Sequence, residues 1–183
     1  MLDFVNNFGK TSEFKYIVKL NDGKYLINFD KVDILVDEIV YKNSKPVKTE
    51  NKIPSGNSMW KSVVIDKYTS PKEIINILSN LIDRDTRYNI TNLFRWNKYN
   101  IYLSKENQMN YKNAYDLAIS TNGESLPVTF KFNNKRTKEN VYYTFDTISE
   151  LKDFYLKVNK HINRCLSNGW KRKDALNENN YKI

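Results

Sequence analysis

Residues 147–174, TISELKDFYLKVNKHINRCLSNGWKRKD, decide how the last third of the chain folds. Thr147 and Glu150 stand three residues apart, which is the capping-box pattern at the start of a helix. Apolar residues then recur at the helical spacing of three and four. The sequence predicts that Gly169 ends this helix in a left-handed C-cap, with Trp170 folded back on the last turn.

Two shorter patterns support this helix. Residues 126–132 (LPVTFKF) and 140–145 (NVYYTF) alternate polar and apolar side chains and are joined by a polar, basic turn, which predicts a β-hairpin. In the middle of the chain, Ser70 and Glu73 form a second capping box with proline between them. This pattern predicts a helix at 71–82.

The N-terminal part reads mainly as strands. Residues 14–20 and 24–29 flank Gly23 and predict a hairpin, because the last loop residue requires a positive φ. Residues 42–58 contain two prolines and few apolar side chains, and are therefore predicted to be a loop. Further expected elements are a strand at 32–41 (alternatively a short helix), a strand at 59–65, an undetermined strand-like segment at 83–103 and a helix at 104–119.

The predicted fold class is α+β: a mainly antiparallel sheet with a capped middle helix and a C-terminal β-hairpin packed on a long helix. We expect an N-terminal mixed β/α region at 1–120, a hairpin-plus-helix region at 121–176 and a mobile tail at 177–183. A single domain is the alternative organisation. A chain of 183 residues with 40% hydrophobic residues is long enough for either.

Composition excludes several classes of site. One cysteine allows no internal disulfide, and one histidine beside it cannot complete a structural zinc site of four nitrogen and sulfur ligands. No signal-peptide pattern and no apolar run of membrane-spanning length occurs, so we expect a soluble, non-secreted protein with no membrane partner.

No catalytic constellation is recognised. His161 and Cys165 are four residues apart and would share a helix face, as a nucleophile and its base do. Both also border the apolar stripe, where a buried cysteine and a hydrogen-bonded histidine need no further role. Asp83 and Asp85 are expected to balance nearby cations. We therefore predict no enzyme and no catalytic, cofactor-binding or metal residues.

The net charge of +9 allows contact with nucleic acid or an acidic partner. Two clusters are candidate partner or nucleic-acid contacts. The first mixes cations with an aromatic ring, the arrangement that binds phosphates and stacks bases, although a half-buried strand gives the same pattern. The second is the densest cationic run, which would also complement a helix C-terminus. The candidates are Arg84, Arg87, Arg95, Trp96 and Lys98 in the first cluster, and Trp170, Lys171, Arg172 and Lys173 in the second.

Five short sequence motifs in the last third of the chain carry a resemblance to known proteins: LPVTF (126–130), YYTF (142–145), ELKDFY (150–155), HINRCL (161–166) and GW (169–170). Over about residues 110–176 the chain resembles small virion proteins of the neck or tail of tailed bacteriophages, including crAss-like phage structural proteins and a tail-associated domain of unknown function.

The resemblance implies a non-enzymatic structural protein found in the virion, and in the host cytoplasm during assembly. It also implies a homo-oligomer that docks to other virion proteins, with a basic surface available for non-specific contact with DNA. The alternative is a small basic phage protein that binds nucleic acid or inhibits a host enzyme.

Overall fold

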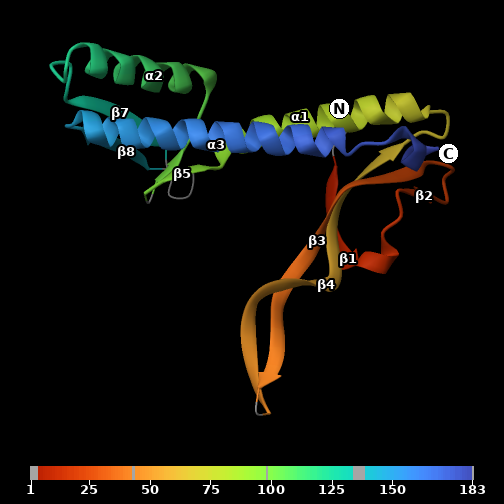
Figure 1. The fold of residues 1–183 in the computed structure, drawn as a ribbon. Coiled ribbons are helices and arrows are strands. Elements are labelled where there is room, and N and C mark those ends of the chain that lie inside the picture. Colours follow the sequence, from red (N-terminus) through yellow and green to blue (C-terminus); the bar gives the residue numbers. More distant parts are fainter. Residues whose placement is uncertain (1–3, 43, 98, 134–138, 183) are drawn as a thin grey trace. The chain divides into compact units, whose positions relative to one another are not determined.

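A computed structural model describes residues 4–42, 44–97, 99–133 and 139–182 of the chain (Figure 1). The chain divides into two units, Met1–Leu81 with Ala175–Ile183, and Ile82–Asp174. Both contain helices and antiparallel strands, so the predicted α+β class is confirmed.

The first unit is built on a four-stranded antiparallel sheet in the order β1-β4-β3-β2. Its short strands are β1 (Val5–Lys10) and β2 (Ile17–Lys19), with a 3-10 turn η1 (Thr11–Glu13) between them. Gly23 closes the hairpin from β2 to β3 with φ +82° and donates its N–H to the Leu20 carbonyl at 3.1 Å, as predicted.

The central strands β3 (Tyr25–Lys42) and β4 (Lys45–Ile65) are far longer than their neighbours, and they continue past β1 and β2 as a two-stranded ribbon (Figure 1). The predicted loop at 42–58 is therefore wrong, because most of it belongs to β4. Pairing with β3 satisfies the backbone hydrogen-bonding groups of this polar segment, although neither face of the segment is buried. Pro54 lies beside an irregularity in that pairing, where proline is tolerated.

Helix α1 (Pro71–Asn92) begins as predicted. The Glu73 N–H donates to Ser70 Oγ at 3.3 Å, and the Ser70 N–H donates to the Glu73 carboxylate at 2.8 Å. The helix extends ten residues beyond its predicted end at residue 82, and the boundary between the two units falls within it. Part of the segment 83–103, treated as strand-like in the sequence, is therefore helical.

The C-terminal segment returns to the first unit. It forms a 3-10 turn, η2 (Glu178–Tyr181), and Tyr181 is buried with its ring centroid 5.6 Å from that of Tyr16. This packing corrects the prediction of a mobile tail at 177–183, because an aromatic side chain anchors it.

The second unit combines the end of α1 with two hairpins and two helices. Its strands form the pairs β5 (Phe94–Trp96) with β6 (Tyr99–Ile101) and β7 (Val128–Asn133) with β8 (Asn140–Phe145). Its helices are α2 (Lys105–Ser120), close to the predicted helix at 104–119 and capped by Ser104, and α3 (Ile148–Asp174).

An aromatic core joins these elements. Phe154 of α3 lies 5.0 Å from Tyr111 of α2 and 5.2 Å from Trp96 of β5 and Phe145 of β8, measured between ring centroids. Because α2 shares this core with α3, the predicted boundary at residues 120–121 does not separate the units. The predicted packing of the C-terminal hairpin on a long helix is confirmed.

Helix α3 does not end at Gly169. It continues to Asp174, and Trp170 is exposed on it instead of folding back. A Cβ added to Gly169 would lie 2.5 Å from Thr86 Oγ1, so the glycine permits a close approach of α3 to α1. The local C-cap prediction was wrong because packing between helices determined the position of this glycine.

Candidate functional site

The first predicted cluster is only partly on the surface. Trp96 is 2% exposed and belongs to the aromatic core, so the prediction that it contacts a partner is corrected. Arg87 and Arg95 are exposed, whereas Arg84 is half-buried. Lys98 lies outside the described residues. The alternative prediction of buried strand aromatics is therefore right for Trp96.

In the second predicted cluster, two residues form ion pairs within the protein and two are exposed on its surface. Arg172 forms an ion pair with Asp85 at 2.7 Å, and Lys173 forms one with Asp83 at 2.8 Å. These pairs connect the last turn of α3 to α1, and they confirm that the two aspartates balance nearby cations. Trp170 and Lys171 remain exposed.

His161 and Cys165 are arranged for a structural role and not as a catalytic pair. His161 Nε2 lies 3.1 Å from the carbonyl oxygen of Asn89 and 3.3 Å from that of Ile90. Both partners are acceptors, so Nε2 carries a hydrogen and cannot take the proton of Cys165, whose Sγ is 3.7 Å away. Burial also raises the pKa of the Cys165 thiol. His161 thus caps the end of α1.

A hollow of about 390 Å³ lies beside this histidine. We call it the cationic hollow; it is lined by Leu93, Phe94, Arg95, Lys157, Lys160, His161 and Arg164. Arg95 stands between buried Phe94 and Trp96 on β5, so strand alternation turns it outward. Lys157, Lys160 and Arg164 have the spacing that places side chains on one helix face.

The charges of the cationic hollow are largely uncompensated. Within the described part of the chain, Arg95, Lys160 and Arg164 form no ion pair, whereas Lys157 pairs with Asp153 at 2.7 Å. The hydrogen bond from Lys157 lowers the pKa of Asp153, with a smaller contribution from the Trp96 indole at 3.5 Å. Of the four cations, only Arg95 was a predicted candidate.

The second notable surface is the ribbon formed by residues 32–42 of β3 and 45–59 of β4, which we call the β-arm. Val32 faces Met59, Val36 faces Ile53 and Val40 faces Val47 in its register. Val32 is 53% and Met59 51% exposed. Because alternate strand residues share a face, these three apolar pairs lie on one side of the ribbon, which also carries Glu38 between Val36 and Val40.

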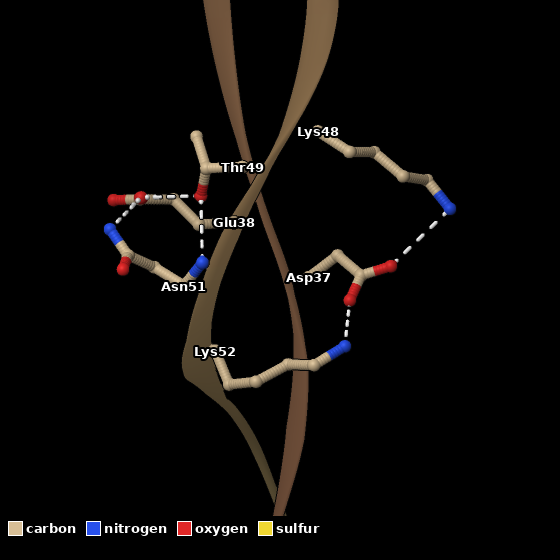
Figure 2. Close-up of polar contacts among 6 residues, drawn as sticks. All are labelled: Asp37, Glu38, Lys48, Thr49, Asn51 and Lys52. Carbon is tan, nitrogen blue, oxygen red and sulfur yellow. Dashed lines mark hydrogen bonds and ion pairs between the residues drawn. The ribbon is translucent and has the colours of Figure 1, made fainter.

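Polar contacts fix the register of the β-arm where β4 carries extra residues (Figure 2). Asp37 pairs with Lys52 and, at 3.4 Å, with Lys48. Adjacent Glu38 points to the other side, where its carboxylate accepts hydrogen bonds from Thr49 at 2.9 Å and Asn51 at 3.1 Å. The hydrogen bond from Lys52, and then that from Lys48, lowers the pKa of Asp37.

No protein-family model, curated protein or solved structure matches this chain. The resemblance to phage virion proteins therefore stays a prediction. In the described ranges, no helix has the length and apolar character needed to cross a bilayer. Those same ranges contain no group of three or more His, Cys, Asp or Glu side chains placed to hold a metal ion.

Proposed function

We propose that the protein is a non-enzymatic structural subunit of a bacteriophage particle, in the neck, connector or tail. In this proposal it assembles with further copies of itself and docks to other virion proteins. The observation that supports assembly is the β-arm, and the resemblance of residues 110–176 supplies the phage context.

The β-arm has the properties of an association surface. An isolated two-stranded ribbon is only marginally stable in water, and its apolar face has no covering layer within the described residues. Outside the stretch Asn57–Met59, which pairs with β1, its outer backbone edges are also available for pairing with another strand. A second copy presenting the same face would cover the pairs Val32–Met59 and Val36–Ile53 symmetrically, as a two-fold contact requires.

The charge of the β-arm also favours a second copy of the chain as its partner. The β-arm contains four lysines and four acidic residues, so it carries no net charge although the chain carries +9. A nearly neutral surface does not attract an acidic partner. The free energy gained by burying apolar area depends only weakly on salt concentration. We therefore expect self-association that persists at high salt.

The test compares Val36→Lys with Leu35→Lys by sedimentation at micromolar concentration. Both residues are exposed on β3, but they lie on opposite faces of the β-arm and add the same charge. The wild type should form a multimer, Val36→Lys should dissociate it, and Leu35→Lys should leave it assembled. A monomeric wild type, or a Val36→Lys variant that assembles normally, would refute assembly through this face.

The predicted nucleic-acid-binding or host-enzyme-inhibiting alternative relied on convergence of its candidate cations. Arg172 and Lys173 are engaged in ion pairs, and Trp96 is buried. The cationic surface that does form uses a largely different set of residues.

A further inference from the structure

The cationic hollow continues into a row of cations along α3. Lys157, Lys160, Arg164 and Lys171 are exposed and follow one another at intervals of three, four and seven residues. These intervals keep the side chains on one face of the helix. From Lys157 to Lys171 the row extends about 21 Å at a rise of 1.5 Å per residue, which is too long for a single small anion.

We propose that this row, together with Arg95, binds the phosphodiester backbone of a nucleic-acid strand. A series of evenly charged phosphates matches a linear set of cations, and neutralising them releases counterions. Arg95 and Arg164 contribute guanidinium groups, whose planar fork suits phosphate oxygens. This site is independent of the β-arm and of the proposed assembly.

The hollow contacts the backbone and does not read the bases. Its two ring-bearing lining residues, Phe94 and His161, are both buried, so neither offers a face on which a base can stack. The remaining apolar residue, Leu93, is exposed at its rim. Contacts confined to phosphates fix position without specifying sequence.

The cations are not needed to complete the end of α1. Four carbonyls of its last turn already accept hydrogen bonds: Tyr88 from Asn92 Nδ2, Asn89 from the Leu93 N–H and His161, Ile90 from His161, and Thr91 from the Leu103 N–H. The ion pair of Lys157 with Asp153 is half-exposed on both sides, so a phosphate can replace the carboxylate at little cost.

The experiment measures fluorescence anisotropy of a labelled oligothymidylate over a series of salt concentrations. The variant Lys160→Gln/Arg164→Gln removes two cations of the row. Its matched control, Lys105→Gln/Lys152→Gln, removes two exposed cations of α2 and α3 that do not line the hollow, with the same change in net charge. Circular dichroism checks that both variants fold.

We expect the wild type to bind with a steep salt dependence. Each phosphate contact contributes about 0.7 to the slope of log K against log salt for single strands, so the hollow variant should lose about 1.4 from that slope. The control should retain the wild-type slope.

Three results would overturn the proposal. The first is no binding of the oligonucleotide at low salt, and the second is an equal loss in both variants, which would indicate net charge alone. The third is equally tight binding of a labelled polyglutamate peptide that the hollow variant also loses. That result would assign the row to an acidic protein partner.

Discussion

Replacing Gly169 by alanine tests the packing of α3 on α1 most directly. Alanine is more favourable than glycine in a helix by about 1 kcal/mol, so local propensity predicts that Gly169→Ala stabilises the protein. The structure predicts the opposite, because the new Cβ would lie 2.5 Å from Thr86 Oγ1 and 3.1 Å from its Cγ2.

The expected magnitude follows from these two opposing terms. Inserting a methyl group into a packed contact costs about 1–3 kcal/mol, and the propensity gain offsets about 1 kcal/mol of that cost. Thr86 is 7% exposed and has little room to move, so we expect net destabilisation of about 1–2 kcal/mol. Urea unfolding followed by circular dichroism measures it, with an unchanged m-value as the check on the unfolding transition.

A double-mutant cycle with Thr86→Ala identifies the cause. Thr86 Oγ1 is buried without a hydrogen-bond partner in the described residues, so its removal breaks no hydrogen bond. In the Thr86→Ala background the nearest atom from that side chain is Cβ, 3.3 Å from the new methyl group, and Gly169→Ala should become neutral or stabilising. Additive effects within about 0.5 kcal/mol, or a single Gly169→Ala variant that gains stability, would refute the close approach.

Two further substitutions test hydrogen bonds seen at helix starts. Ser70→Ala should destabilise α1 by about 1 kcal/mol. The Ser70 hydroxyl lowers the Glu73 pKa, so this contribution is present above the unfolded carboxyl pKa and lost as the pH falls through the folded value; acid titration of stability should therefore be flatter in the variant. The Tyr143 hydroxyl donates to Glu150, which raises the Tyr143 pKa from 10.0 to about 12. The stabilisation from this hydrogen bond is complete below pH 10 and is lost as the pH rises toward 12. Tyr143→Phe should therefore remove part of the loss of stability seen at alkaline pH. Tyr142→Phe, on the adjacent exposed residue, is the control.

Local signals in the sequence were sufficient for several elements. The Ser70 and Glu73 pair located the start of α1, and Ser104 located the start of α2, because a capping side chain acts on backbone within the next turn. At the start of α3 the pattern was half right: Thr147 Oγ1 accepts from the Glu150 N–H at 3.2 Å, but the Glu150 carboxylate bonds Tyr143.

Features set by distant parts of the chain were not predicted. Residues 45–57 contain no buried residue, so this polar stretch with two prolines resembled a loop, and only β3 supplies its backbone partners. Gly169 carried the usual signal of a helix end, and only Thr86, 83 positions earlier, explains why the helix continues.

The same distinction explains the outcome for the candidate site. Trp96 and Arg95 are adjacent in the sequence, yet strand alternation buries one and exposes the other. Lys157, Lys160 and Arg164 were not among the predicted candidates. Their regular spacing beside the apolar stripe was the available signal, but only the segment after α1 and β5 turn that face into a hollow.

Salt distinguishes the two proposed surfaces because they differ in charge. The β-arm carries no net charge, so its apolar contacts should survive high salt. The row on α3 acts through phosphates, whose binding weakens as a power of salt concentration. A multimer that dissociates at high salt together with nucleic acid would therefore argue that charge, and not the apolar face of the β-arm, holds the subunits together.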